Sequence, residues 1–262
     1  MTLQQTPPIV TTEALRNSIK NYKKDSKGVD NWTATELRAV PDLVLDSFTN
    51  VLNNSLKVAA TPHQNLMSLH PCLGKPNNGA RTICKTPMIF RNQSRVLFHD
   101  VVKWELDNPR DYDSAQRGSS ALQSALYKSL MAEMAHFNHQ ESIMLLADYE
   151  KFVDTVDLPL LIQSFIDTGY PLHQANMSIQ QHIAPRVIKA EGCSSQPIPI
   201  NRSIIAGDMQ SVAFTRSYLK DPMTKLDEDN PGVKPKLFVD DTSLYGAGPE
   251  GETYNKVIKA IL

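Results

Sequence analysis

The sequence has few of the features that identify several common classes of protein. It contains three cysteines in 262 residues. Cys72, Cys84 and Cys193 share no Cys-x-x-Cys spacing, which argues against a disulfide framework and against a zinc site. No apolar run approaches the roughly 18 residues of a membrane span, and the N-terminus lacks the charged and apolar regions of a signal peptide. These absences predict an intracellular protein, nuclear or cytoplasmic, that does not contact a membrane.

An overall basic charge is also missing, since the formal net charge is -1. The composition alone therefore does not indicate nucleic-acid binding. The charges are unevenly distributed, however, because residues 75–103 carry six basic side chains against a single acid, Asp100. The basic residues are Lys75, Arg81, Lys85, Arg91, Arg95 and Lys103. This stretch is suited to holding phosphates, and a solvated basic face is the alternative.

The remaining composition is ordinary for a globular protein of one large or two modest domains, with 41% hydrophobic and 21% charged residues. Apolar periodicity predicts helices at 12–20, 91–107, 172–183 and 211–219, and one from Pro41 whose apolar stripe should belong to the core. The stripe consists of Leu43, Val44, Phe48, Val51, Leu52 and Leu56. Strands are predicted at 66–73, 82–84, 142–147, 185–190 and 196–200, and residues 221–235 are predicted to form a polar, acidic loop.

The stretch from Val233 to Gly246 is the part of the chain most suggestive of chemistry. Two short runs of strand-forming residues flank Asp240 and Asp241, a pattern that predicts a hairpin with both carboxylates at its tight turn. An Asp pair by itself is usually only a turn former. Two like charges fixed on a rigid turn repel each other, and a cation with all-oxygen coordination, most plausibly Mg²⁺, would relieve that repulsion.

Two further regions can complete such a site. Asp148 directly follows the apolar run 142–147, so it is the candidate for a third carboxylate at the end of a buried strand. The predicted hairpin formed by 66–73 and 82–84 carries Lys75 and Arg81 at the edges of its loop. A lysine offers a point charge and an arginine a two-pronged donor, an arrangement suited to a polyphosphate. An exposed hairpin with solubilising charges is the alternative.

With these motifs in order, the chain resembles reverse transcriptases, most like those of non-LTR retrotransposons, from about Gly28 to the end. Residues 147–156, Ala-Asp-Tyr-Glu-Lys-Phe-Val-Asp-Thr-Val, resemble motif A of that family. Residues 205–211, Ile-Ala-Gly-Asp-Met-Gln-Ser, are similar to motif B, and Phe238-Val239-Asp240-Asp241 looks like motif C. Residues 75–83 resemble the fingers hairpin that holds the triphosphate. Each match is weak alone, but four in the family's order are a strong indication.

The resemblance implies an α+β fold: a polymerase palm, built as an antiparallel sheet with packed helices, plus a fingers subdomain, with the thumb absent. The implied divisions are an N-terminal arm and helix at 1–27, fingers leading into the palm at 28–140, and a palm with motifs A, B and C at 141–262. The chain ends at Leu262, before the motif D and thumb of such enzymes, so we expect a palm that is incomplete at its C-terminus. Further domains of the same polyprotein are expected as partners.

The chemistry implied is two-metal nucleotidyl transfer from a deoxynucleoside triphosphate to the 3'-hydroxyl of a DNA primer on an RNA template. Asp148 and Asp240 would bind two Mg²⁺ ions, with Mn²⁺ as an alternative, and the Tyr149 carbonyl would be a further ligand. Asp241 would support the catalytic site electrostatically.

The resemblance also assigns nucleotide-binding residues. Lys75 and Arg81 would hold the triphosphate, and Tyr149 would line the nucleotide site. Val153 would shape the sugar pocket, unless Phe152 takes that place, and Gln210 would lie against the template and the incoming nucleotide. Val239 fills the variable position of motif C, where it is expected to continue the strand.

Three alternatives remain open at this stage. An RNA-directed RNA polymerase would share the spaced acids Asp148 and Asp154, but such enzymes usually carry Gly before the Asp pair, where this chain has Val239. A catalytically incomplete remnant that only binds nucleic acid would fit the missing thumb. An unrelated α/β protein with chance carboxylates is disfavoured by four motifs in order.

Overall fold

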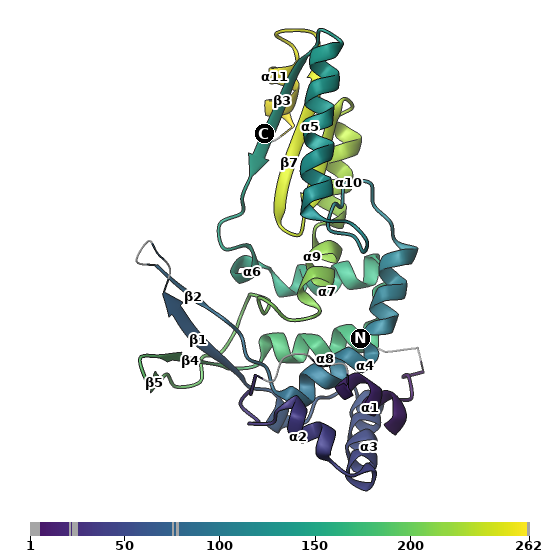
Figure 1. Ribbon diagram of the computed structural model, residues 1–262, viewed down its shortest axis with the longest axis vertical. Helices are drawn as coiled ribbons and strands as arrows, with labels where there is room; N and C mark the ends of the chain where they lie inside the picture. The colour runs from purple at the N-terminus through teal and green to yellow at the C-terminus, as the bar shows by residue number, and fades with distance from the viewer. Residues whose placement is uncertain (1–5, 21, 23–25, 75, 77–78, 261–262) are drawn as a thin grey trace. The chain divides into compact units, whose positions relative to one another are not determined.

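The computed structural model describes residues 6–20, 22, 26–74, 76 and 79–260 (Figure 1). The fold mixes helices and strands, which confirms the α+β class. The chain forms two compact units, and each is built from two separate stretches of sequence. Unit 1 comprises Met1–Trp104 and Val153–Ala213, and unit 2 comprises Glu105–Phe152 and Phe214–Leu262. The range 28–140, predicted as fingers, therefore contributes to both units.

Unit 1 is mainly helical. Its helices are α1 (Thr12–Lys20), α2 (Ala34–Ala39), α3 (Asp42–Val58), α7 (Leu158–Asp167) and α8 (Leu172–Ile183), with a short 3₁₀ turn at His63–Asn65. Three further helices cross the unit boundaries: α4 (Met88–Asp107), α6 (Phe152–Thr155) and α9 (Ser211–Tyr218). A buried cluster that includes Leu15, Leu37, Leu45 and Leu97 joins α1, α2, α3 and α4. No helix among the described residues is long and apolar enough to cross a membrane.

Helix α3 corrects part of the predicted core. Pro41 precedes its first turn as expected, and Leu52 and Leu56 are buried. Leu43 and Val51, however, are 80% and 51% exposed. The buried face of α3 contains Leu45 instead of Leu43. These two residues are two positions apart, which is a rotation of about 200° around the helix axis, so their side chains lie on opposite faces.

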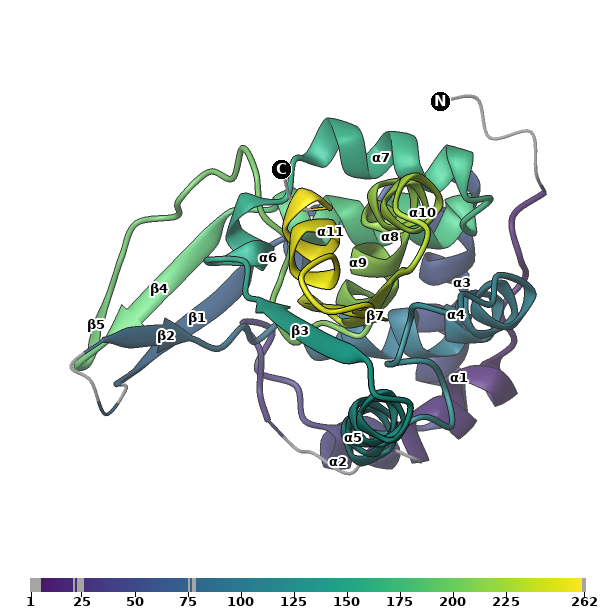
Figure 2. The ribbon, with the colours of Figure 1, turned by 90° about the horizontal axis from the view of Figure 1, so that it is seen from above.

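The sheet of unit 1 has the order β2-β1-β4-β5 (Figure 2). Its strands are β1 (Ser68–Gly74), β2 (Ala80–Thr82), β4 (Arg186–Ala190) and β5 (Cys193–Ser194). β1 and β2 pair antiparallel, which confirms the predicted hairpin, although its second strand spans Ala80–Thr82 and not 82–84. β1 also pairs with β4 in parallel. The strand predicted at 196–200 is wrong, since only an isolated bridge between Ile198 and Arg186 forms there. Pro197 and Pro199 lack the backbone N–H groups that a ladder requires.

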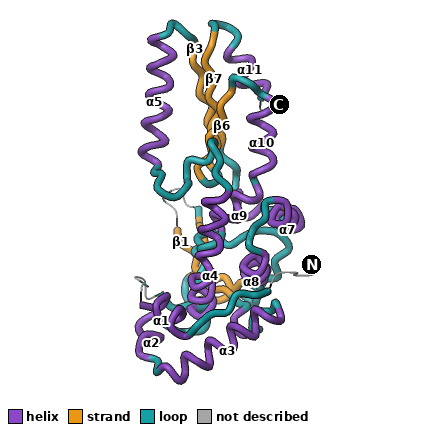
Figure 3. The backbone as a smooth tube through the Cα atoms, turned by 90° about the vertical axis from the view of Figure 1, so that its right-hand side faces the viewer, coloured by secondary structure: helices purple, strands orange, loops and turns teal. Residues whose placement is uncertain are grey.

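Unit 2 is a three-stranded antiparallel sheet between helices (Figure 3). Its strands are β3 (Glu141–Ala147), β6 (Val233–Phe238) and β7 (Asp241–Gly248), in the order β3-β7-β6. Helix α5 (Ala121–Phe137) covers one face, where the Tyr245 hydroxyl donates to the Met131 carbonyl. Helices α10 (Lys220–Asp229) and α11 (Thr253–Lys259) cover the other, where Leu244 packs in one cluster with Val257.

Helix α10 replaces much of the predicted loop at 221–235. Asp221 and Pro222 lie in its first turn, positions where both residue types are favourable in a helix. Met223 is buried and Leu226 packs against the sheet, so two apolar residues three positions apart hold an otherwise polar helix in place. The prediction was wrong because such a short apolar face is hidden by the acidic composition.

Candidate active site

The predicted Asp-Asp hairpin forms, with its turn one residue earlier than expected. β6 and β7 are in register with Phe238 opposite Asp241, which leaves Val239 and Asp240 as the two loop residues. Asp240 lies in the turn and Asp241 is the first residue of β7. Val239 does not continue the strand; its φ of 62° is in the left-handed region. A β-branched residue in that region is strained, and glycine is the usual occupant.

The strand register brings the three predicted catalytic carboxylates to one end of the sheet of unit 2. β3 pairs with β7 so that Ala147 faces Thr242. Extending this register by one residue sets Asp148 opposite Asp241, beside the turn that carries Asp240. Asp148 and Asp241 are exposed and Asp240 is half-buried, so all three can be reached from solvent.

The donors at this end of the sheet are all oxygens, the type that Mg²⁺ and Mn²⁺ prefer. Within the described part of the chain, no three His, Cys, Asp or Glu side chains are already gathered closely enough to hold a metal ion. The Tyr149 carbonyl, the predicted fourth donor, accepts a 3.3 Å hydrogen bond from the Phe152 amide. A carbonyl oxygen has two lone pairs, so this long bond is compatible with a second role. The donor chemistry therefore fits the implied metals.

Tyr149, the residue that follows Asp148, packs against further aromatic side chains. The Tyr149 ring is 43% exposed and lies 5.8 Å from the ring of Phe152, measured between centroids. Phe152 is buried and contacts Tyr218 of α9 at 6.2 Å. The Tyr149 ring is thus an exposed aromatic surface on a buried support.

A buried arginine in unit 2 stabilises the strand that leads to the Asp-Asp turn. The Arg216 side chain is 8% exposed, pairs with Asp113 at 2.7 Å and also pairs with Glu105. The segment that contains Asp113 is in turn hydrogen-bonded to β6, because Leu237 donates to the Tyr112 carbonyl at 2.7 Å. Removing one member of such a buried group leaves an unpaired charge, so the three charges are expected to act together.

Unit 1 contains a cavity of about 560 Å³ beside the motif B-like segment. Its walls come from the base of the β1–β2 hairpin, from α4, from the segment before α2 and from residues 205–209. The lining residues are Tyr22, Ser26, Ile83, Cys84, Lys85, Thr86, Arg91, Ser94, Ile205, Ala206, Gly207, Asp208 and Met209. The cavity combines an aromatic ring, two cations and one acid, and six of its thirteen lining residues belong to the stretches 75–83 and 205–211 that carry the resemblance.

Burial raises the pKa of two polar groups that line this cavity. Burial raises the pKa of Cys84 to about 12, so its thiol stays protonated at neutral pH and is a poor nucleophile. Burial also raises the pKa of Tyr22. Arg91 donates to both the side chain and the backbone carbonyl of Ser26, which fixes its guanidinium at the cavity wall.

Two upstream residues hold the start of α4 against the β1–β2 hairpin. A Cβ at Gly28 would lie 2.3 Å from the Thr86 carbonyl oxygen, so only glycine allows this close approach. Asp30 accepts a hydrogen bond from the Ile89 amide in the first turn of α4. The Gly28-Val29-Asp30 block thus has a structural role in forming the cavity wall.

The predicted nucleotide-binding residues are divided between the units. Tyr149 belongs to unit 2, whereas Arg81, Val153 and Gln210 belong to unit 1. Arg81 is exposed on β2, opposite Leu73. Val153 is half-buried, and its carbonyl accepts from the Ile204 amide at 2.8 Å. Lys75, the other predicted triphosphate ligand, lies outside the described residues.

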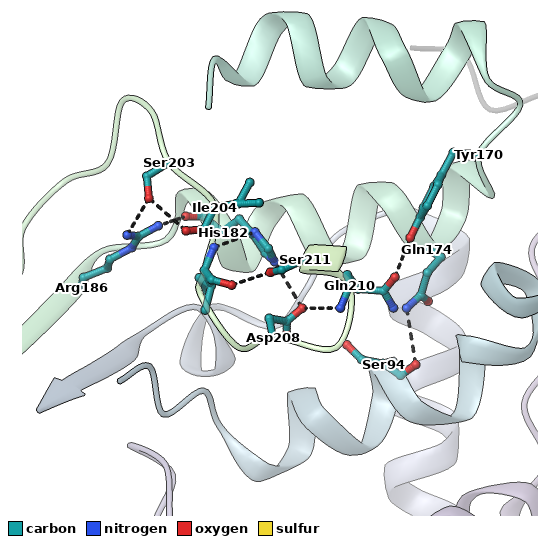
Figure 4. A network of polar contacts seen from close by, with 11 residues as sticks. Ser94, Tyr170, Gln174, His182, Arg186, Ser203, Ile204, Asp208, Gln210 and Ser211 are labelled. Carbon is teal, nitrogen blue, oxygen red and sulfur yellow. Dashed lines mark hydrogen bonds and ion pairs between the residues drawn. The ribbon is translucent and has the colours of Figure 1, made fainter. Parts of the chain in front are cut away.

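The side chain of Gln210 is directed into the interior of unit 1 (Figure 4). It is fully buried, and its Oε1 accepts from the Tyr170 hydroxyl at 2.5 Å. Its Nε2 has no hydrogen-bond partner within the described part of the chain. For Gln210 to lie against template and nucleotide as predicted, either its backbone must make the contact or its side chain must rotate out of the interior.

Sequence reasoning missed Arg216 and the buried pair of His182 with Asp208. Arg216 lies in a helix whose apolar pattern gave no reason to expect a buried charge. His182 lies on α8, whose buried face also includes Gln174, Ser178 and Gln181. Polar residues on the inner face of a helix at three- and four-residue steps were the available indication, because buried polar groups need partners.

No protein-family model matches this chain, and no curated protein matches it in sequence.

Proposed function

We propose that this chain is the catalytic domain of an RNA-directed DNA polymerase of a mobile element. The observation that carries the proposal is the β3–β7 register, which sets Asp148 opposite Asp241 and beside Asp240. Three carboxylates from two distant stretches lie at the same solvent-accessible end of the sheet, although their side chains are not gathered into a metal-binding group. The exposed aromatic surface of Tyr149 beside them is suited to a nucleotide base or sugar.

Each residue of the site has a defined task in this proposal. When bound, two divalent cations would activate the primer hydroxyl and offset charge on the triphosphate. Asp148 and Asp240 would hold these cations, together with the Tyr149 carbonyl, while Asp241 would add negative charge beside them. Arg81 and Lys75 would neutralise the leaving pyrophosphate. The cavity of unit 1 would receive the template or the incoming nucleotide against residues 205–209.

Primer extension by the purified chain tests the proposal. The assay compares RNA with DNA templates, and deoxynucleotides with ribonucleotides, in Mg²⁺ and in Mn²⁺. We expect deoxynucleotide addition on RNA, at a rate that falls to background in Asp240→Ala. Asp229→Ala, which removes an exposed acid of α10 in the same unit, is the matched control and should keep the wild-type rate.

Other outcomes point to specific alternatives. Ribonucleotide addition on RNA with little deoxynucleotide use would indicate an RNA-directed RNA polymerase. If a folded chain binds primer–template yet adds nothing under any condition, the polymerase proposal is wrong for this chain, and nucleic-acid binding alone becomes its function.

A further inference from the structure

The segment 205–211 is held by one side chain from a neighbouring helix. It runs from Ile205 to Ser211, and Gly207 stands within it with φ of 82°, a conformation that glycine adopts without strain. The segment forms one wall of the unit 1 cavity. Its shape therefore decides what that cavity can accept.

His182, at the end of α8, contacts this segment at two points, Ile205 and Asp208 (Figure 4). Its Nδ1 accepts a hydrogen bond from the Ile205 amide at 3.1 Å. Because a backbone amide can only donate, Nδ1 carries no proton, and the proton of the neutral ring is on Nε2. Nε2 lies 3.3 Å from Asp208 Oδ1 and donates to it. The two ring nitrogens thus bind two residues that are three positions apart.

Asp208 also binds the backbone near the C-terminal end of the segment. The same Oδ1 accepts from the Gln210 amide at 3.0 Å. The His182 and Asp208 side chains are 0% and 3% exposed, so solvent does not compete for these bonds. The Ser211 hydroxyl closes the segment by donating to the Ile205 carbonyl. Hydrogen bonds to a buried carboxylate are among the stronger ones in proteins.

The helix end that carries His182 is itself fixed. Arg186 donates to the His182 carbonyl at 3.2 Å and to the Ser203 hydroxyl at 3.0 Å. Ser203 donates in turn to the Ile204 carbonyl, directly before the segment. The imidazole is therefore presented from a hydrogen-bonded helix end.

We propose that His182 is a positioning residue that fixes the shape of segment 205–211, and through it the wall of the unit 1 cavity. Asp208 is its partner, and both act by holding the backbone of the segment. The consequence for nucleotide or template binding rests on the polymerase function proposed above. The consequence for the segment itself does not.

Three substitutions separate the two bonds of the imidazole. His182→Leu removes both. His182→Asn keeps an acceptor near the Nδ1 position and so can retain the bond to the Ile205 amide, but it cannot reach Asp208. Asp208→Asn keeps an oxygen that can accept from both His182 and the Gln210 amide while it removes the charge. His173→Asn, the same change at the other histidine of α8, is the matched control.

Amide hydrogen exchange, followed residue by residue by NMR, is the decisive measurement. In His182→Leu we expect exchange at Ile205 and Gln210 to accelerate at least about tenfold, while amides of α7 keep their wild-type rates. His182→Asn should restore protection at Ile205 but not at Gln210, and His173→Asn should change neither. Wild-type exchange at both amides in His182→Leu would overturn the proposal, as would failure of His182→Asn to protect Ile205.

Steady-state kinetics then tests the link to catalysis. We expect His182→Leu to raise the KM for deoxynucleotide or primer–template at least about fivefold with a smaller change in kcat, and His182→Asn to recover part of the loss. A wild-type chain without polymerase activity would refute the proposed function and leave the exchange result to decide the role of His182. Altered exchange with unchanged KM values would show that this segment does not line the substrate site.

Discussion

Ala147 of β3 lies opposite Thr242 of β7, and extending this register by one residue sets Asp148 across from Asp241. The two carboxylates come from stretches of the chain about ninety residues apart. Antiparallel pairing fixes their approach, because a shift of one residue would turn every side chain of β3 to the opposite face of the sheet. A strand register is thus the physical basis of the candidate site.

The first prediction concerns the carboxylates themselves. Asp148→Ala and Asp240→Ala should each lower nucleotide addition at least about 10³-fold, since each change removes a proposed metal ligand. The fold should survive, because both residues lie at or beyond strand ends and their removal relieves repulsion between like charges. Primer extension measures the rate, and thermal unfolding checks the fold. Substantial activity in either variant would contradict the assignment of that residue as a ligand.

The second prediction concerns the sugar pocket. Val153→Phe should raise the preference for deoxynucleotides over ribonucleotides about tenfold, because a larger side chain leaves less room for the 2'-hydroxyl. The fold should tolerate the change, since the contact of Val153 with Ile204 is made by its backbone carbonyl.

The ratio of kcat/KM for the two nucleotide types measures this preference. Val153→Ala, which would enlarge the proposed sugar pocket, should shift the ratio in the opposite direction. Equal ratios in both variants and in the wild type would show that Val153 does not select the sugar, and the adjacent Phe152 would then be the residue to test.

The sequence predicted the elements that a few strong local patterns define. Helix α8 and strand β3 form close to their predicted bounds, and the Asp-Asp hairpin follows from its flanking strand formers. The prediction that Asp148 ends a buried strand was wrong: no residue of β3 is buried, and Leu146 is 73% exposed, because β3 is the edge strand of its sheet. Helix α10 was missed because its apolar face is short, with Met223 buried and Leu226 packed against the sheet. Its stability comes from tertiary contacts rather than from its own composition.

The site residues that could not be predicted from the sequence are buried polar residues whose partners lie far away in the chain. His182, Asp208 and Arg216 are polar residues whose partners are distant in sequence or in a loop, so their pairing is visible only once the chain is folded. The conformation of Val239 was also hidden. The residue type predicts strand, and the register of the two flanking strands forces it into a turn.

The third prediction tests the strain at Val239. Its φ of 62° is costly for a β-branched residue, by about 1–3 kcal/mol. Val239→Gly should therefore raise the free energy of unfolding by about 1 kcal/mol, after the flexibility of glycine in the unfolded chain is subtracted.

Urea denaturation measures the change, and Val239→Ala is the control because it shortens the side chain but keeps a Cβ. Alanine should recover less of the strain than glycine does. If the two variants have the same stability, the strain at this turn is not released by removing the Cβ, and the prediction fails.

The fourth prediction concerns pH and the buried His70 of β1. Burial, with a smaller contribution from Arg186, lowers the pKa of His70 to about 4, against an ordinary value of 6.5. Its Nε2 lies 3.0 Å from the Ser68 hydroxyl in the folded chain. Between these two pKa values the unfolded state binds a proton that the folded state does not. Stability must therefore fall as the pH falls from about 6.5 towards 4.

The expected loss from this residue between pH 7.5 and pH 5 is about 2 kcal/mol. Because other groups also titrate in this range, the measurement is a comparison of urea denaturation at the two pH values for the wild type and for His70→Gln. Glutamine can still bond the Ser68 hydroxyl but does not titrate, so the variant should lose about 2 kcal/mol less than the wild type over the same interval. Equal losses would mean that His70 becomes protonated as readily in the folded chain as in the unfolded one, and the parallel pairing of β1 with β4 would then not shield it from solvent.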